Sequence, residues 1–298
     1  RYRSSAASDV YKRQVLATGE IWIKVPETIL IKWTGQTDAF VTAKDMMLAT
    51  CAKIGMGGGR YQAIQYAGEA IHKLNMQERM TMSNMAAELG AQAGLISPDE
   101  TTIEYLKSVN ASILDNWQNY QIEKPDLNGE VINLDASSLS PQIAAPHSPE
   151  NSADVDDFKN ISFDIAYIGA CTGAKYTDLM AAASILKNRK VSSNVCLKVA
   201  PASLRDQQRA EREGIMRILE DAGAEFLPNS CGICAGYGSD RLLKEQVCIS
   251  STARNFKGRM GDPSSKVYLA SPYTVAASAI AGTMAVSYTH LRAHETVR

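Results

Sequence analysis

The stretch FDIAYIGACTGAKYTDLMAAASILKN, residues 163–188, joins a nearly continuous apolar strand, a turn and an alanine-rich helix. A second strand is predicted at 194–200 (NVCLKVA), a long helix at 201–223, and a third strand at 224–228 (AEFLP). Strands that alternate with helices form βα units, which build a mainly parallel sheet covered by helices. We therefore expect an α/β fold.

The same kind of pattern extends in both directions along the chain. Downstream, strands are predicted at 247–251 (VCISS) and 266–271 (KVYLAS), and an alanine-rich helix follows. Upstream, two short strands are predicted at 20–33, a helix at 43–55, a glycine-rich turn at 55–60 and a strand at 61–68. A helix in two pieces follows over 69–94. A further helix then begins after Ser97, which forms a capping box with Glu100.

A segment dense in Pro, Ser, Asn and Asp separates these two halves. Its low periodicity predicts a long connection with one short strand at EVINLD, residues 130–135. The two ends of the chain differ in composition and periodicity from the parts they flank, and both resemble translated sequencing adapters. The predicted organisation is a tail at 1–14, an α/β domain at 15–120, a linker at 121–158, an α/β domain at 159–285 and a tail at 286–298.

The composition excludes several classes of partner. The 298-residue chain has 45% hydrophobic residues and a formal net charge of −1, with no long run of Lys and Arg, so nucleic-acid binding is not expected. Its longest apolar stretch is shorter than the roughly 20 residues that cross a bilayer. Six cysteines without a secretory leader favour reduced thiols or metal ligands, and we expect a cytoplasmic protein.

Three cysteines follow the ends of predicted strands. Cys171 comes directly after the strand of residues 163–170, and Cys231 and Cys234 form a CxxC pair just after the strand of residues 224–228. Ligand sites of parallel sheets lie beyond the carboxyl ends of the strands, so these thiols are expected at one edge. A closed zinc site needs four ligands, whereas a cluster held by three thiolates leaves one iron open as a Lewis acid.

The remaining cysteines are not expected at that edge. Cys196 and Cys248 fall inside predicted strands and are interpreted as core residues, although either would complete a zinc site if it reached the other thiols. In STARNFKGRMG, residues 251–261, Arg254 and Arg259 lie five residues apart in a loop after a strand. Their forked guanidinium groups suit a carboxylate clamp, and solvated surface arginines are the alternative.

Four motifs in order resemble the aconitase superfamily: IGACTGAKYTDL (168–179), NSCGICAGYGSDRL (229–242), CISSTARNFKGRMG (248–261) and YLASPYTVAASAIAG (268–282). The upstream segments are most similar to the large subunits of 3-isopropylmalate dehydratases and their homoaconitase relatives, and the resemblance covers residues 19–285. It implies three-layer α/β/α domains with mainly parallel sheets around an iron–sulfur site, in which 15–120 is a partial amino-terminal region and 159–285 binds the cluster.

The resemblance implies a hydro-lyase that isomerises a hydroxy polycarboxylate by dehydration and rehydration. Leucine biosynthesis with 3-isopropylmalate is the first expectation, and a homoaconitase or a methylated-malate dehydratase is the alternative. Cys171, Cys231 and Cys234 match the thiolates of a 4Fe-4S cluster, while Arg254 and Arg259 match substrate-binding arginines. A structural zinc module and an electron-transfer protein remain the alternatives of other classes.

Two further residues receive catalytic roles only through the resemblance. Asn84 and Glu88 match positions that approach the cluster, and their i, i+4 spacing predicts one helical face. The chain departs from the family pattern at Gly173 and Ala253, where asparagine is common. These two departures put the identity of the substrate in doubt, and not the binding of the cluster.

The resemblance also implies a partner. No sequence before Glu20 resembles the family's amino-terminal region, and in two-subunit members the proton-abstracting serine lies on a small swivel-domain subunit. We therefore expect an amino-terminally truncated large subunit that needs this small subunit and is inactive alone.

Overall fold

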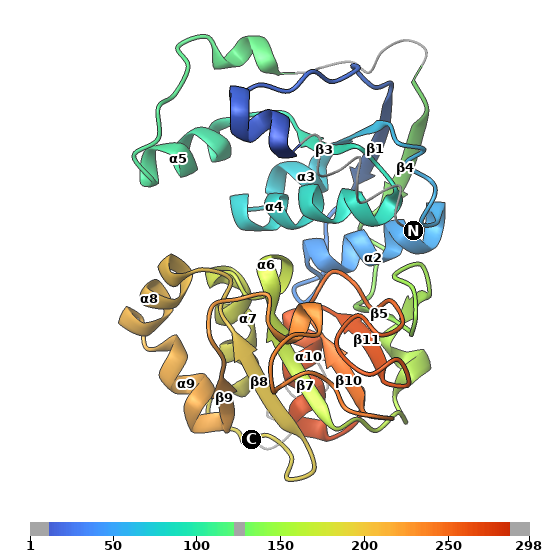
Figure 1. Ribbon diagram of the computed structural model, residues 1–298, viewed down its shortest axis with the longest axis vertical. Helices are drawn as coiled ribbons and strands as arrows, with labels where there is room; N and C mark the ends of the chain where they lie inside the picture. Colours follow the sequence, from blue (N-terminus) through green and yellow to red (C-terminus); the bar gives the residue numbers. More distant parts are fainter. Residues whose placement is uncertain (1–11, 122–128, 287–298) are drawn as a thin grey trace.

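Two sheets form the framework of the computed structural model, which describes residues 12–121 and 129–286. The first has four strands in the order β3-β2-β1-β4, and the second has seven in the order β6-β5-β11-β10-β7-β8-β9. Strand pairs are parallel except where β5 pairs with β11 and with β6. Figure 1 shows the two sheets with their helices stacked along the long axis. The predicted α/β class with mainly parallel sheets is confirmed.

The first half is built from four strands and the helices between them. They are β1 (Thr28–Thr34), α2 (Ala43–Ile54), β2 (Ala63–Ala67), α3 (Glu69–Lys73), α4 (Met76–Met85), the 3-10 turn η1 (Ala86–Leu89), β3 (Ala93–Ile96), α5 (Glu100–Ser108), η2 (Trp117–Tyr120) and β4 (Val131–Asp135).

The second half follows the predicted βα pattern. Its elements are β5 (Gln142–Ala144), β6 (Ser152–Asp154), η3 (Val155–Phe158), β7 (Ile165–Gly169), α6 (Ala170–Gly173), α7 (Tyr176–Leu186), β8 (Cys196–Ala200), α8 (Leu204–Arg212), α9 (Ile215–Ala222), β9 (Ala224–Phe226), η4 (Ile233–Ala235), β10 (Val247–Ser250), β11 (Lys266–Ala270) and α10 (Pro272–Ala281).

Several local predictions differ from the structure. The first strand expected within 20–33 does not form, because residues around Pro26 have no neighbouring strand to pair with, and Trp22 is 71% exposed. The long helix at 201–223 is two helices, since Gly214 adopts a left-handed φ of +73° between α8 and α9. The helix after Ser97 is capped by Asp99 instead, whose side chain accepts from the backbone N–H of Thr102.

Strand β3 replaces the end of a predicted helix. Its Gly94 lies so close to α4 and η1 that a Cβ there would stand 2.6 Å from Cβ of Ala86 and 3.0 Å from Cα of Ser83. The strand pairs in parallel with β2, so tertiary pairing outweighs local helix propensity here.

The crossing between the two sheets falls inside the segment predicted as a linker. Strand β4 completes the first sheet, whereas β5 and β6 form an edge of the second, so the chain changes sheets between Asp135 and Gln142. Asp45 on α2 accepts from the backbone N–H of Gln142 at 2.9 Å and thereby anchors that helix to the start of the second sheet. The predicted tails 1–14 and 286–298 fall mainly outside the described residues.

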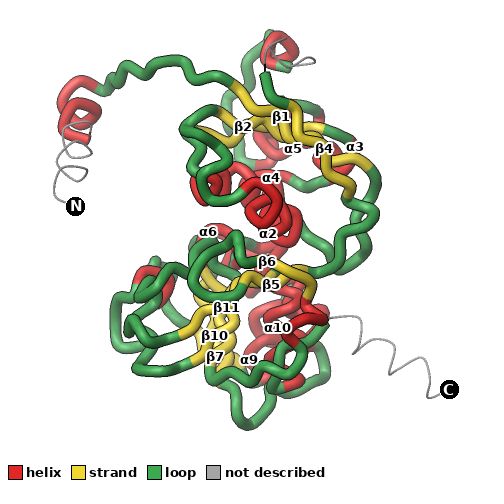
Figure 2. Tube along the Cα trace, turned by 90° about the vertical axis from the view of Figure 1, so that its right-hand side faces the viewer, coloured by secondary structure: helices red, strands yellow, loops and turns green. Residues whose placement is uncertain are grey.

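The two halves share a hydrophobic core. One buried cluster contains residues of the first sheet, of α2 and α4, and of the near face of the second sheet, including Tyr167 and Cys248. Alternate residues of the same strands, such as Ala166 and Ile168, face a second cluster formed with α7, α9 and α10. Figure 2 shows α2 and α4 lying between the sheets. Among the described residues, no helix is long and apolar enough to span a membrane.

Candidate functional site

A pocket of about 380 Å³ opens at the carboxyl edge of the second sheet. It is lined by residues that follow β7, β8, β9 and β10 together with one residue of α4, which is the position expected for ligand sites in parallel sheets. The lining residues are Asn84, Ala170, Cys171, Thr172, Pro201, Ala202, Asn229, Ser230, Cys231, Cys234, Ala253, Arg254 and Arg259.

All three predicted thiols lie in this pocket. Cys171 sits in the short helix α6 and is exposed, while Cys231 is exposed and Cys234 half-buried in the loop after β9. Ala170, just before Cys171, has a φ of +68°, a strained value for a residue with a side chain. The backbone is thus bent at the end of β7 to turn this thiol into the pocket.

The other cysteines do not reach the pocket. Cys248 is buried within β10, where burial raises the pKa of its thiol, and Cys196 begins β8, at the end of the strand away from the site. Within residues 12–121 and 129–286, no three His, Cys, Asp or Glu side chains converge closely enough to hold a single metal ion. A closed zinc site needs such convergence, whereas each thiolate of a cluster binds a different iron. Three thiols spread around one pocket suit ligands to separate irons of such a cluster.

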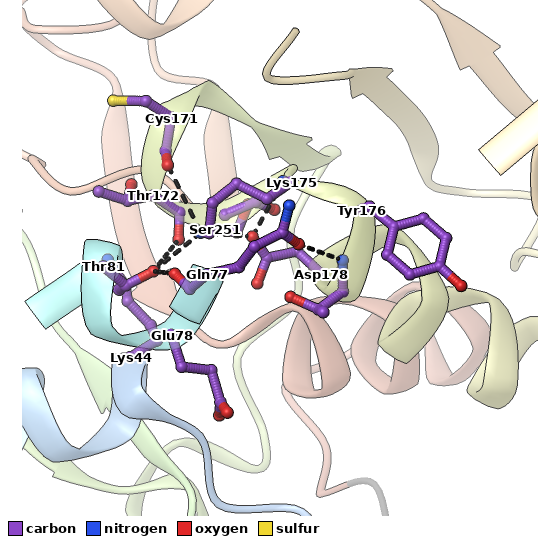
Figure 3. Close-up of polar contacts among 12 residues, drawn as sticks. Lys44, Gln77, Glu78, Thr81, Cys171, Thr172, Lys175, Tyr176, Asp178 and Ser251 are labelled. Carbon is purple, nitrogen blue, oxygen red and sulfur yellow. Dashed lines mark hydrogen bonds and ion pairs between the residues drawn. The ribbon is translucent and has the colours of Figure 1, made fainter. Parts of the chain in front are cut away.

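Asn84 reaches the pocket from the other half of the molecule. It lies at the end of α4, and its Nδ2 donates to Sγ of Cys171 at 3.3 Å. The helix is held there by contacts across the two halves, shown in Figure 3: Nζ of Lys175 donates to Oγ1 of Thr81 at 2.8 Å, and Oγ1 of Thr81 donates to the carbonyl of Thr172 at 3.3 Å. These bonds fix α4 against the turn that carries Cys171.

Glu88 lies behind the pocket instead of lining it. Helix α4 ends at Met85, and the 3-10 turn η1 brings Glu88 inward to an exposed fraction of 2%, while Asn84 stays exposed. The single helical face expected for these two residues is therefore interrupted. Oε1 of Glu88 accepts from Nε of Arg254 at 2.6 Å, which joins a predicted catalytic residue to a predicted substrate-binding residue.

The charge balance behind the pocket involves a buried lysine that the sequence analysis missed. Burial raises the pKa of Glu88, and the nearby cations of Arg254, Lys44 and Arg259 oppose this shift. Burial lowers the pKa of Lys44 to about 8, and its Nζ donates to the carbonyl of Thr252 at 2.5 Å. Lys44 shares a helical face with Met47, Leu48 and Cys51, a spacing that signals a buried position.

Arg259 contributes a second guanidinium to the pocket. Burial raises the pKa of the Cys234 thiol, and the positive charge of Arg259 acts against that rise. The Nε of Arg259 is buried without a hydrogen-bond partner in the described part of the chain. A buried, unpaired donor of a charged group is costly, so this atom favours an anionic ligand.

Gly173 and Ser251 form a close contact that explains one departure from the family pattern. A Cβ at Gly173 would stand 2.3 Å from the carbonyl oxygen of Ser251, so no side chain fits without a backbone shift. The hydroxyl of Ser251 accepts from the N–H of Gly169 at 3.0 Å and donates to the carbonyl of Gly173 at 2.9 Å. Ser251 thus holds both sides of the turn containing Cys171, a role that no spacing in the sequence reveals.

The fold and the pocket define an α/β protein with a site lined by three thiols and two arginines at the carboxyl edge of a parallel sheet. The chain belongs to the aconitase family: the model of that family, described as aconitate hydratase, matches residues 8–164 and 156–282.

The chain is also similar to curated proteins that are named as large subunits of 3-isopropylmalate dehydratase. The 3-isopropylmalate dehydratase large subunit 1 of Pyrococcus furiosus is 42% identical over 91% of this chain and 63% of its own length. The corresponding proteins of Hydrogenobaculum (43% over 91% and 63%) and Archaeoglobus fulgidus (41% over 90% and 63%) are similarly close. The chain therefore spans about 63% of the length of these relatives. Among solved structures, the holo form of Thermococcus kodakaraensis aconitase X aligns with 80% of this chain and 53% of its own, with 13% identity and a TM-score of 0.42.

Proposed function

We propose that the chain is the large-subunit part of an iron–sulfur hydro-lyase that isomerises a hydroxy polycarboxylate by dehydration and rehydration. The observation that carries the proposal is one pocket lined jointly by three thiols and two arginines. The names of the curated relatives favour 3-isopropylmalate as the substrate. Leucine biosynthesis as the pathway and the cytoplasm as the location are part of the same proposal.

The proposed cofactor is a 4Fe-4S cluster held by Cys171, Cys231 and Cys234. These are the thiols of the described chain that share the pocket, and thiolates are the usual protein ligands of such clusters. When bound, a cluster with three thiolate ligands supplies an iron open to act as a Lewis acid on a leaving hydroxyl group. Asn84, which already donates to Cys171, would stabilise the charge of that sulfur.

The arginines are assigned to the carboxylates of the substrate. Glu88 holds Nε of Arg254, and this fixes the plane of a guanidinium that lines the pocket. Arg259 adds a second guanidinium group, whose buried Nε has no hydrogen-bond partner in the part of the chain that the structure describes. Two fixed guanidinium groups can bind two carboxylates and orient the carbons between them, which favours reaction by lowering the entropic cost of alignment.

Glu88 has a second part in the proposal. Its carboxyl group is buried, and its raised pKa makes it a better proton acceptor than an exposed carboxylate. Because it contacts Arg254, a change in its charge would alter the position of the clamp, and its direct contact with substrate remains part of the proposal.

A small subunit is the proposed partner. The relatives are named as large subunits, a name that implies a second chain in the working enzyme. We propose that this partner covers the open pocket and supplies the group that abstracts the proton from the substrate.

Metal and sulfide analysis of the anaerobically reconstituted chain tests the proposal. We expect about four irons and four sulfides per chain, and a three-iron paramagnetic signal after mild oxidation, which reports one iron without a thiolate. The variant Cys231→Ser should lose most of this iron. The matched control Cys196→Ser should retain it, because Cys196 lies outside the pocket.

Three outcomes would contradict the proposal. Folded protein that binds no iron, protein that binds stoichiometric zinc without sulfide, and an iron content unchanged in Cys231→Ser would each exclude the proposed cluster. Turnover of 3-isopropylmalate by the chain combined with a small subunit then tests the substrate, with a homocitrate-like acid and a methylated malate as the competing compounds.

A further inference from the structure

Tyr167 is a buried residue of β7 whose hydroxyl group has no partner. Its exposed fraction is 0%, and within the described residues its Oη makes no hydrogen bond. A buried hydroxyl without a hydrogen bond destabilises a protein, because it gives up its bonds to water and gains none in return. Such a group is rarely left in a core without a function or a ligand to satisfy it.

The ring of Tyr167 leans toward the thiol pocket. Tyr167 and Gly169 point to the same face of β7, and a Cβ added at Gly169 would stand 2.1 Å from Cζ and 2.3 Å from Oη of Tyr167. The end of the ring therefore occupies the space beside Gly169, two residues before Cys171. Because β7 runs toward the pocket, the hydroxyl is directed along the strand to its carboxyl edge.

The pocket edge to which the hydroxyl points is lined by thiols, and Cys171 follows Gly169 by two residues. Cys248 is buried in β10, and its thiol donates to the carbonyl of Ile249 at 3.4 Å. Cys231 and Cys234 belong to the pocket, so an acceptor held by them would lie on the side to which the hydroxyl points.

We propose that the Tyr167 hydroxyl donates a hydrogen bond to a sulfur of the inorganic group held in the pocket, and that Tyr167 is a positioning residue of that group. The inference rests on the proposed cluster. The acceptor is either the Cys231 or Cys234 thiolate or an inorganic sulfide; both are sulfur anions that accept such a bond. The hydrogen bond withdraws charge from the sulfur, and bonds of this kind raise the reduction potential of iron–sulfur groups.

A matched pair of variants isolates this hydroxyl. Tyr167→Phe removes only the phenol oxygen, and because that oxygen has no partner among the described residues, the variant is expected to fold. Tyr66→Phe is the control: Tyr66 is also buried, and its hydroxyl also lacks a partner within residues 12–121 and 129–286, but it lies in β2, in the first sheet, and does not line the pocket.

The full 298-residue chain is reconstituted with iron and sulfide, and iron–sulfur vibrations are recorded by resonance Raman spectroscopy in H2O and D2O. We expect deuterium-sensitive bands in the parent chain and in Tyr66→Phe, and loss of that sensitivity in Tyr167→Phe. Bands that also shift with ³⁴S-labelled sulfide identify an inorganic sulfide as the acceptor, and bands that do not shift identify a thiolate. Air oxidation should destroy the group roughly tenfold faster in Tyr167→Phe, the effect of losing one bond to a charged acceptor.

The outcomes separate this inference from the proposed function. A parent chain that binds no iron overturns both. A parent chain that binds iron, with Tyr167→Phe retaining the deuterium shift and the oxidation rate of the parent, overturns the role of Tyr167 and leaves the cluster in place. The same loss in Tyr66→Phe would also overturn it, because that hydroxyl lies outside the pocket.

Discussion

Arg254 and Glu88, separated by 166 residues, meet with Nε and Oε1 2.6 Å apart at the back of the thiol pocket. The carboxylate is 2% exposed and the guanidinium 37% exposed, so the pair spans the boundary between core and pocket. Arg254, which lines the pocket, is therefore held by Glu88, which does not line it, so a change at Glu88 is expected to alter the position of Arg254.

Removing the cation should destabilise the fold in a pH-dependent way. In Arg254→Met a buried carboxylate loses its partner, and we expect a loss of about 2–3 kcal/mol at pH 8, less than for a fully buried pair because Arg254 is partly exposed. The pKa of Glu88, already raised by burial, should rise further. A raised folded-state pKa gives stability that is present at low pH and lost as pH rises, so the deficit should shrink at pH 5.

Urea unfolding at pH 5 and pH 8 measures this effect. The double variant Glu88→Gln with Arg254→Met removes both charges of this pair, and it should recover most of the loss at pH 8. Equal deficits at both pH values, or no recovery in the double variant, would show that the pair is screened by solvent.

The two departures from the family pattern should behave differently when asparagine is restored. Gly173→Asn forces a side chain against the backbone of Ser251, where even a Cβ would lie 2.3 Å from its carbonyl oxygen, and we expect a loss of about 1–3 kcal/mol. Ala253→Asn adds atoms toward an open pocket, and its stability should change by less than about 0.5 kcal/mol. Thermal unfolding of both variants tests the contrast, and equal losses would contradict it.

The convergence of the three thiols could be predicted from the sequence for a simple reason. The strand before Cys171 is a nearly continuous apolar run, and the strand before Cys231 follows a long predicted helix. Parallel strands of one sheet, here β7 and β9 on either side of β8, bring the loops at their carboxyl ends to one edge. Both steps depend on local pattern and a general topological rule. The resemblance added Asn84, whose contact with Cys171 crosses between the two halves.

The parts that escaped prediction depend on tertiary packing. The burial of Glu88 results from the turn η1, the buried charge of Lys44 from packing between the sheets, and the role of Ser251 from the close approach of β7 and β10. Strand β3 forms only because β2 offers a partner. The burial of Glu88, the role of Ser251 and the pairing of β3 leave no periodic signal in the sequence. Lys44 is a partial exception, because it shares a helical face with apolar residues.

Lys175 should stabilise the contact between the two halves. Its Nζ, on a side chain 7% exposed, bonds Asp178 at 2.7 Å and Thr81 at 2.8 Å. Lys175→Met leaves a nearly buried carboxylate without its partner, and we expect a loss of about 2–4 kcal/mol together with weaker retention of iron, because α4 and the Cys171 turn are joined there.

Lys159→Met is the matched control for this change. Lys159 also pairs with an aspartate three residues away, Asp156, but both side chains are about half exposed, at 52% and 53%. Its removal should change stability by less than about 1 kcal/mol. Urea unfolding of the apo proteins and iron content after gel filtration provide the two readouts, and similar losses in both variants would refute the role of Lys175.

Asp99 should account for part of the acid sensitivity of the first half. Its carboxylate accepts two hydrogen bonds from Arg79, at 2.6 and 2.7 Å, and the guanidinium is 2% exposed. Burial acts to raise the pKa of Asp99, but the bonds from Arg79 and Thr102 outweigh it and lower the pKa to about 2. A pKa lowered by this much corresponds to about 2.5 kcal/mol.

The sign of this contribution is set by the lowered pKa. A depressed folded-state pKa gives stability that is full above the unfolded value near 4 and is lost as pH falls through about 2. Asp99→Asn should therefore lose about 2–3 kcal/mol at pH 7 and differ little from the parent near pH 2, because protonated Asp99 resembles the amide. Urea midpoints at pH 7, 4 and 2.5 test this, with the exposed Asp156→Asn as control. A difference that stays constant down to pH 2.5 would show that shape, and not charge, is what Asp99 contributes.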